Sequence, residues 1–489
     1  MELRNRKIEE EEFLEWRKEV LAQWPTGKDV DLDEAIEYHK SLPPSKNHVL
    51  KLLDAKKKGI TLVHSNMGFT TLEQNKDLLR SLQNEGGSQF LRTIQDSLTR
   101  TKRFAEAEKA VKEAEKTNKN LLNGFPAVVY GVKKVRELQE SVDMPMAVAG
   151  PTIDSRLSAE ICLAAGYTSA ASGGGVGSWV GYSKNTPYET AVNNALYGCA
   201  LHRYYKERGV PMGVGGIIHA PLNVTGATPP SLGSAFSILN VSVALTQGAT
   251  HLSTGAKSQG NLIQDVASNV ARMELVREYA DKFGAKDIEI FLSNGCIDGP
   301  YPADHAQAIV VALQGPMLSA LTKAQSCWIK TIDEADAIPT KENNIFSLRA
   351  AKMMIDILSP AKIDLMNSKQ VRDEVEQEKR EAKAIAEKVF EFGDGDPIIG
   401  ARKAFEQGVL DWPLANNKNV KAKVMGVKDA EGAVRYLDFG NLPFSKEMKE
   451  FHREKVADRG KSIGKELDYD IVVSDVLALS RGSLLSNLG

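Results

Sequence analysis

A lysine and a glutamate stand four residues apart at the end of a short apolar segment of this chain. The segment 326–331 reads SCWIKT, so Lys330 lies near its end, and Glu334 follows. An ammonium group beside a carboxylate can donate to and accept from one polar ligand. A structural interpretation also stays open, in which the lysine caps a strand and the glutamate begins the next helix.

Glycines gather after other apolar segments. Residues 173–175 read GGG, and further glycines occur at 213–216 and 255–260. Glycines after a strand can cradle a phosphate or let a cofactor approach the backbone. None of these stretches fits GxGxxG or the P-loop pattern, so neither kind of nucleotide-binding loop is expected. The eight histidines form no HxH, HxxxH or HExxH, so no metal site is expected.

Eight short apolar segments alternate with stretches of helical pattern, and they predict the frame that holds these residues. Helical patterns fill most intervals, for example 154–165, 188–208, 260–284 and 303–323. Such alternation is typical of a (β/α)8 TIM barrel, whose functional residues lie at the carboxyl ends of its strands. A doubly wound parallel sheet is the alternative. The predicted strands are 59–64, 127–132, 144–149, 166–171, 213–219, 249–254, 288–294 and 326–331.

The chain divides into three regions on this interpretation. Residues 1–57 form an N-terminal helical extension, with helices at about 9–22, 31–40 and 46–57. Residues 58–355 form the barrel, and residues 356–489 form an α+β appendage. In that last region the sequence predicts a charged helix at 367–391, two strands within 421–437 joined by a turn at 429–432, and a helix at 445–458.

The composition points to an ordinary globular protein. Among 489 residues, 42% are hydrophobic and 26% are charged, and the net charge is −2. This balance provides no field that would attract nucleic acid or an anionic membrane. The chain has no stretch of 18 apolar residues and no secretory leader, so we expect a cytoplasmic protein. The four cysteines form no CxxC and are expected to be reduced and buried: Cys162, Cys199, Cys296 and Cys327.

Six separated segments, met in order along the chain, carry a family resemblance. They read AQWPTGK at 22–28, LLNGFP at 121–126, DSRLSAE at 154–160, SQGNLIQD at 258–265, IPTKE at 338–342 and RYLDFGNLPF at 435–444. Together they resemble the large (epsilon) subunit of adenosylcobalamin-dependent glutamate mutase, from Met1 to about residue 485. The resemblance implies the TIM barrel and a radical isomerase, a carbon-skeleton mutase.

The resemblance also implies where the cofactor would bind. Lys330 and Glu334 would hydrogen-bond the adenosyl ribose, and the corrin face would lie against Gly173, Gly174 and Gly175. Gly68 and Asn123 would line the adenosyl and substrate cavity. The chain has no Asp-x-His-x-x-Gly, the motif that supplies a histidine to cobalt. The resemblance therefore implies a separate small cobalamin-binding subunit, and a homodimer of large subunits.

The residues that would bind the substrate depart from the family pattern. The family grips glutamate with three arginines, of which Arg100 matches one, whereas the others fall on Asn66 and Ala149. The family's glutamate before the triple glycine falls on Ala171 or Ser172. One family tyrosine matches Tyr182, which would contact a polar substrate group, and the other falls on Ser178.

Loss of two arginines would weaken glutamate binding by roughly 4 kcal/mol or more, so we expect a substrate amino acid or related acid other than free glutamate. Three alternatives stay open: genuine glutamate mutase, a non-radical barrel enzyme such as a lyase, and a non-catalytic paralogue that only binds.

Overall fold

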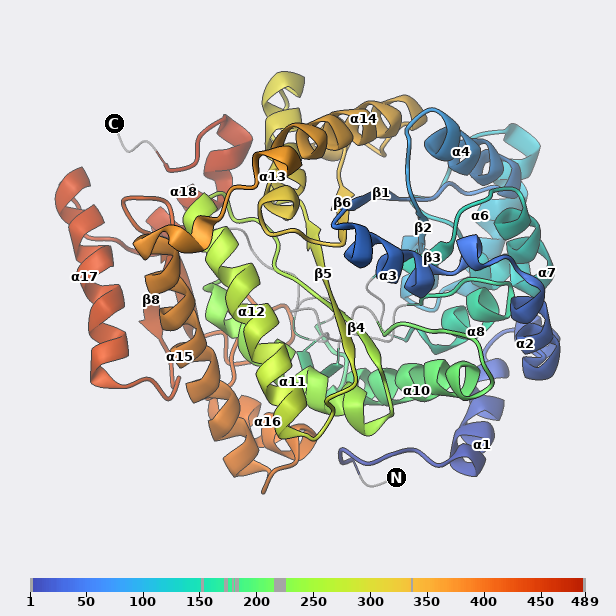
Figure 1. Ribbon diagram of the computed structural model, residues 1–489, viewed down its shortest axis with the longest axis horizontal. Helices are drawn as coiled ribbons and strands as arrows, with labels where there is room; N and C mark the ends of the chain where they lie inside the picture. Colours follow the sequence, from blue (N-terminus) through green and yellow to red (C-terminus); the bar gives the residue numbers. More distant parts are fainter. Residues whose placement is uncertain are drawn as a thin grey trace.

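A six-stranded parallel sheet forms the centre of the molecule in the computed structural model (Figure 1). The structure describes residues 3–150, 154–170, 175–177, 180, 184–214, 226–335 and 337–486. The strand order is β3-β2-β1-β6-β5-β4, and each strand runs parallel to its neighbours. The strands are β1 Leu62–Met67, β2 Leu91–Ile94, β3 Met146–Ala149, β4 His251–Thr254, β5 Glu289–Gly295 and β6 Ser326–Ile329.

One further parallel bridge extends the sheet at each edge. Ala147 of β3 pairs with Ser169, and Leu252 of β4 pairs with Val214. Segments 166–171 and 213–219, both predicted as strands, each contribute one bridge, and residues 171 and 215–219 lie outside the described residues. Within the described part of the chain, no pairing joins these two outer segments. The observed architecture is therefore a mixed α/β fold with a parallel sheet of six strands.

Parallel strands require crossover connections, and helices provide them. The N-terminal half contains α1 Glu10–Leu21, α2 Leu32–Ser41, α3 His48–Lys58, α4 Leu72–Asn84, α5 Ser97–Arg100, α6 Phe104–Thr117, α7 Ala127–Glu140 and α8 Arg156–Ala164. The next helices are α10 Tyr188–Glu207, α11 Pro230–Thr246, α12 Leu262–Lys282, α13 His305–Leu321 and α14 Lys341–Leu358. The three helices predicted before residue 58 are confirmed, as are the four examples predicted between the strands.

The predicted strand at 127–132 is wrong, because these residues begin α7. Val128 and Val132 are buried one helical turn apart, and Gly131 interrupts the helical geometry at φ 70°. A short apolar run without alternation fits a buried helix as well as a strand. The sequence prediction also missed β2, which has only four residues and carries the charged Arg92 in its middle.

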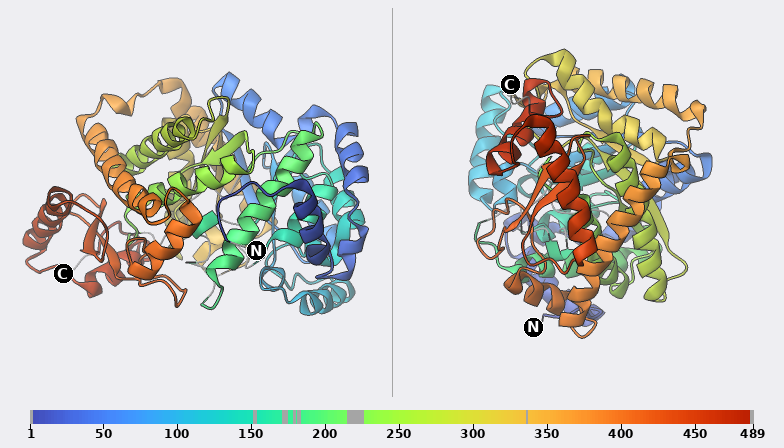
Figure 2. Two further views of the ribbon diagram at one scale, coloured as in Figure 1. Left: turned by 90° about the horizontal axis from the view of Figure 1, so that it is seen from below. Right: turned by 90° about the vertical axis from the view of Figure 1, so that its left-hand side faces the viewer.

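The C-terminal region packs against the outer helices of the sheet (Figure 2). It comprises α15 Lys369–Phe392, α16 Pro397–Gln407, β7 Val424–Lys428, β8 Val434–Phe439, α17 Lys446–Ile463 and α18 Tyr469–Ala478. The predicted charged helix, the antiparallel strand pair and the helix that follows it are confirmed. Helix α15 packs against both α11 and α12. One apolar core cluster takes side chains from Ile8 through Leu479, so all three predicted regions contribute to it.

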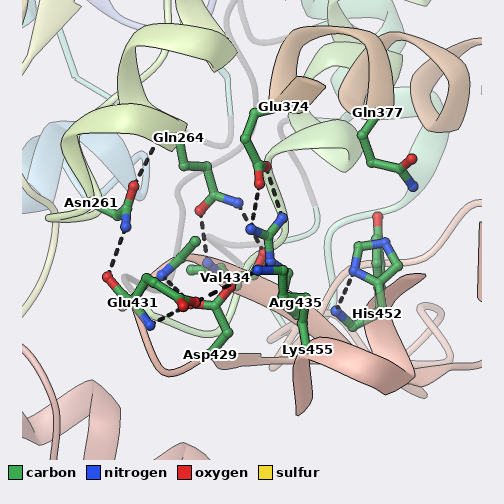
Figure 3. Close-up of polar contacts among 12 residues, drawn as sticks. Asn261, Gln264, Glu374, Gln377, Asp429, Glu431, Val434, Arg435, His452 and Lys455 are labelled. Atoms are coloured by element: carbon green, nitrogen blue, oxygen red, sulfur yellow. Dashed lines mark hydrogen bonds and ion pairs between the residues drawn. The ribbon is translucent and has the colours of Figure 1, made fainter. Parts of the chain in front are cut away.

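Polar contacts fix the β7–β8 hairpin to α12 and α15 (Figure 3). The Gln264 amide donates to the Val434 carbonyl at 3.1 Å and accepts from the Val434 N–H at 2.7 Å. Arg435 donates through Nε to Asp429 at 2.7 Å and through Nη1 to Glu374 of α15 at 2.8 Å. Asn261 Nδ2 donates to the Glu431 carbonyl at 2.8 Å. The hairpin is thus anchored by a buried arginine between two carboxylates.

All four cysteines are free thiols in the interior, as expected from their spacing. None of the helices in the described residues combines the length and apolar character needed to cross a bilayer.

Removal of the Arg435 anchor should destabilise the protein. The Arg435→Met variant leaves the carboxylates of Asp429 and Glu374 without their cation, and breaking a buried pair in this way costs about 3–5 kcal/mol. Denaturant unfolding would measure the change. The matched control is Arg453→Met, because that side chain is 57% exposed and its loss should change stability by roughly 0.5 kcal/mol or less. Equal free energies of unfolding for the two variants would contradict the stabilising role of Arg435.

Candidate active site

Four charged side chains meet at the carboxyl ends of β4, β5 and β6. Lys257 follows β4, Asp298 follows β5, Lys330 follows β6, and Glu334 lies in the short 3-10 helix Ile332–Ala335. Lys330 Nζ lies 2.8 Å from Glu334 Oε2 and 3.7 Å from Asp298 Oδ1. Lys257 forms an ion pair with the other oxygen of Asp298. Two cations and two anions therefore alternate along this edge of the sheet.

Burial and charge act in opposite directions on Lys330. Its side chain is 19% exposed, and burial by itself lowers the pKa of an ammonium group. The carboxylates of Asp298 and Glu334 outweigh burial and raise the pKa of Lys330 above its ordinary value. Lys330 is therefore a fixed cation at neutral pH. It can donate hydrogen bonds, but it has no accessible proton equilibrium that would make it a general base.

A buried thiol holds the loop that carries Lys330. The Lys330 backbone N–H donates to Cys296 Sγ at 3.3 Å, and this thiol lies close to the carbonyls of Ala312 and Trp328. Burial raises the pKa of Cys296 well above its ordinary value. The group therefore stays a neutral thiol, which supports the loop and is no nucleophile.

The loop 121–126 crosses the carboxyl ends of β1 and β2, in the other half of the sheet. The Gly124 N–H donates to the Gly68 carbonyl at 3.0 Å, and the Phe125 N–H donates to the Ile94 carbonyl at 2.8 Å. A Cβ on Gly68 would lie 2.6 Å from the Phe125 nitrogen. Backbone packing therefore already requires glycine at position 68. The loop places Asn123, which is exposed, at this edge.

Arg100 ends the short helix α5, which follows β2, and it lies near Gly150 after β3. Its Nε donates to the Gln95 carbonyl at 2.7 Å, and the Gln95 N–H donates to the Ala149 carbonyl at 2.9 Å. A Cβ on Gly150 would lie 3.4 Å from Arg100 Nε. The structure therefore brings Arg100 beside Ala149. Asn66 lies on β1, and its Oδ1 is buried without a hydrogen-bond partner among the described residues.

The glycine run and the predicted tyrosine lie mostly outside the described residues. Of this set the structure describes only Gly175, at the start of the 3-10 helix Gly175–Gly177. Gly175 has φ +60°, and a Cβ there would lie 2.1 Å from Asn240 Oδ1 of α11, which accepts from the Val176 N–H. This position requires glycine for packing alone. Residues outside the description are Ala171, Ser172, Gly173, Gly174, Ser178 and Tyr182.

The sequence prediction missed Lys257 and Asp298. Each is a charged residue shortly after an apolar strand, which is the same signal that identified Lys330. The sequence pattern of segment 255–260 draws attention to its glycines and not to Lys257. The described residues contain no group of three or more His, Cys, Asp or Glu side chains suited to a metal ion.

Asp298 should control the ionisation of Lys330. The Asp298→Asn variant removes one of the two carboxylates, so the pKa of Lys330 should fall and a larger fraction of its amine should be neutral at mildly alkaline pH. Amine-reactive labelling, read by mass spectrometry at Lys330, should then be several-fold faster than in the wild type. Asp77→Asn, which removes the partner of Lys341 instead, is the control. Unchanged labelling of Lys330 in Asp298→Asn would contradict the predicted coupling.

Comparison with known proteins finds relatives that match almost the whole chain. Residues 42–487 match the family model described as methylaspartate mutase E chain (MutE). The chain is similar to the glutamate mutase epsilon subunits of Desulfitobacterium hafniense and Treponema denticola, with 39% identity over 490 residues and 99% of each chain covered. The corresponding protein of Escherichia coli O157:H7 is 33% identical over 491 residues, again with 99% of each chain covered. This chain therefore belongs to the methylaspartate mutase E chain family of isomerases.

Proposed function

We propose that this chain is the catalytic large subunit of an adenosylcobalamin-dependent carbon-skeleton mutase. The observation that carries the proposal is the Lys330–Glu334 pair at the carboxyl edge of the sheet, in a chain of this family. We also propose that the sheet closes into a (β/α)8 barrel. Segments 166–171 and 213–219, which bridge to the two edge strands, would be the two remaining strands of the barrel, between β3 and β4.

The residues at the carboxyl edge fit an adenosyl ribose. Glu334 accepts a hydrogen bond from Lys330 through Oε2, and no described residue donates to its Oε1. This second oxygen can therefore accept a hydrogen bond from a ribose hydroxyl. Lys330 can donate to the same diol while Asp298 holds it in place. The exposed Asn123 provides a further amide at the opposite side. When bound, adenosylcobalamin supplies the homolytic chemistry of a weak cobalt–carbon bond. This chain's residues would orient the ribose and exclude water.

The proposal includes a second kind of subunit. The sequence lacks Asp-x-His-x-x-Gly, so this chain has no motif that would supply a histidine to cobalt. The relatives are themselves named as epsilon subunits, which is consistent with a larger assembly. A small cobalamin-binding subunit would hold the corrinoid against the carboxyl edge, and two large subunits would pair. The four free cysteines are consistent with a cytoplasmic setting.

Arg100 is the proposed anchor for a substrate carboxylate. It lies beside Ala149, and the neutral Asn66 occupies β1. With a single arginine at the substrate positions, the preferred substrate would be an amino acid or related acid other than free glutamate. The comparisons do not support this choice of substrate. The second candidate is L-glutamate, converted to 3-methylaspartate, and the names of the relatives favour it.

Glu334→Gln should impair the cofactor site. The amide keeps the shape but loses the charge that accepts from the ribose, and a hydrogen bond to a charged group contributes about 1.5–3 kcal/mol. With the small subunit added, adenosylcobalamin affinity and the rate of cobalt–carbon cleavage should together fall by roughly ten- to a hundredfold. Absorbance titration and stopped-flow absorbance would measure both. Glu342→Gln, on the exposed first turn of α14, is the control. If Glu334→Gln kept the wild-type affinity and cleavage rate, Glu334 would not contact the cofactor and the proposal would be wrong.

Arg100 and the substrate can be tested in one series of assays. The reconstituted enzyme should convert L-glutamate to 3-methylaspartate at well below about 1 s⁻¹, a usual rate for an enzyme on its own substrate. An acid with one free carboxylate should react faster. Arg100→Lys should lower kcat/KM for the best substrate about tenfold or more, because lysine does not replace a bidentate guanidinium. Fast turnover of glutamate would favour L-glutamate as the natural substrate. Wild-type activity of Arg100→Lys would contradict the proposal that Arg100 binds a substrate carboxylate.

A further inference from the structure

A small cavity lies among the strands of the sheet, apart from the charged row that follows β4, β5 and β6. Its volume is about 40 Å³. Helix α3 covers it with His48, β1 contributes His64, and β2 contributes Arg92. Four hydroxyl side chains complete the polar lining: Ser169, Ser253, Ser293 and Ser326. Helix α3 is held there by apolar contacts of Leu52 and Ala55 with Leu62, Phe90 and Phe291.

Three basic side chains in this cavity each have a buried nitrogen without a hydrogen-bond partner among the described residues. These atoms are His48 Nε2, His64 Nε2 and Arg92 Nε. His64 is fully buried, and its other ring nitrogen lies 3.4 Å from the Ser65 carbonyl. The ring of Phe90 lies between the two imidazoles, with centroid distances of 4.6 Å to His48 and 3.9 Å to His64. The three basic groups are thus fixed around one space.

No carboxylate balances this charge within the described residues. Burial lowers the pKa of Arg92 to about 10, and no acidic group opposes the effect. Burial, followed by the charge of Arg92, lowers the pKa of His48 to about 3 and that of His64 well below its ordinary value. Among the undescribed residues, only Glu2 and Asp336 are acidic.

Arg92 is partly buried, and its Nε is buried without a hydrogen-bond partner among the described residues. A guanidinium in such a place is unfavourable without a counter-charge, because buried charges require pairing. Arginine does not escape by losing its proton, since its guanidinium stays charged in proteins. None of the described carboxylates lies here, so we expect the balancing charge to come from a bound anion. The described geometry provides donors for such a charge: the Arg92 Nε–H, the serine hydroxyls and, once protonated, the imidazoles.

We propose that this cavity binds one small inorganic anion of the size of chloride. Its volume exceeds the roughly 10–15 Å³ that one water molecule needs, but it is too small for a nucleotide or a dicarboxylic acid. Ser326 Oγ donates to Ser293 Oγ at 2.8 Å, which leaves the Ser293 hydroxyl proton to point at the ion. The anion would neutralise Arg92 and tie α3 to the base of the sheet. This proposal is independent of the cofactor, the substrate and the small subunit.

Thermal unfolding of the full chain would test the site in solution. Chloride is varied over a hundredfold range against gluconate at constant ionic strength. The unfolding midpoint should rise with chloride in the wild type, because a ligand that binds only the folded state stabilises it. It should not rise in Arg92→Met. The control is Arg349→Met, which removes an exposed arginine and should keep the wild-type response. A response equal in all three proteins, or absent from the wild type, would overturn the proposal.

A crystal of the wild-type chain grown with bromide provides a test that needs no variant. The anomalous signal should show a peak within hydrogen-bond distance of Arg92 Nε. No peak there would mean that water alone fills the cavity, and it would overturn the proposal even if Arg92→Met failed to fold. A peak at crystal concentrations without any chloride effect on the unfolding midpoint would show an adventitious ion only, and would overturn it as well.

Discussion

Parallel pairing of the six central strands is the constraint on which the rest of the structure depends. Because neighbouring strands run in the same direction, each connection must cross over the sheet, and helices provide that crossing. All carboxyl ends consequently meet at one edge, and all amino ends meet at the other. Residues that are far apart in the chain, such as Lys257, Asp298 and Lys330, therefore become neighbours. No local feature of the sequence would bring them together.

The two proposed sites differ in how their charges are balanced. At the carboxyl end, two lysines alternate with two carboxylates, so the charges compensate and Lys330 stays a cation despite its burial. Balanced groups of this kind can bind a polar ligand without a large change in their own ionisation. At the second site, Arg92 and two histidines surround a cavity with no described carboxylate. Uncompensated charge calls for a counter-ion, and that difference separates the two proposed sites chemically.

Buried contacts hold the elements around the site at the carboxyl edge. The thiol of Cys296 holds the backbone of Lys330, and the pair Gly68–Gly124 lets two loops touch at the ends of β1 and β2. On the outside, Arg435 and Gln264 hold the C-terminal hairpin against α12 and α15. These contacts involve backbone groups or buried ion pairs, which tolerate little displacement. Side chains at the carboxyl edge are therefore positioned by elements that do not themselves take part in chemistry.

The sequence by itself determined the family, the helices before residue 58, the strand-and-helix character of the C-terminal region, and the Lys330–Glu334 pair. The family depends on six separated segments, and the others depend on local spacing: apolar periodicity, turn residues, or two charged groups four residues apart. Tertiary structure decided the rest. Segment 127–132 became a helix, because the burial of Val128 and Val132 on one face depends on what packs against them. The four-residue strand β2 is too short and too polar to show a pattern, and only its neighbours β1 and β3 fix it. The balance of charge also depends on distances through space: carboxylates surround Lys330, whereas none of the described carboxylates lies near Arg92. The order of residues along a chain does not show those distances.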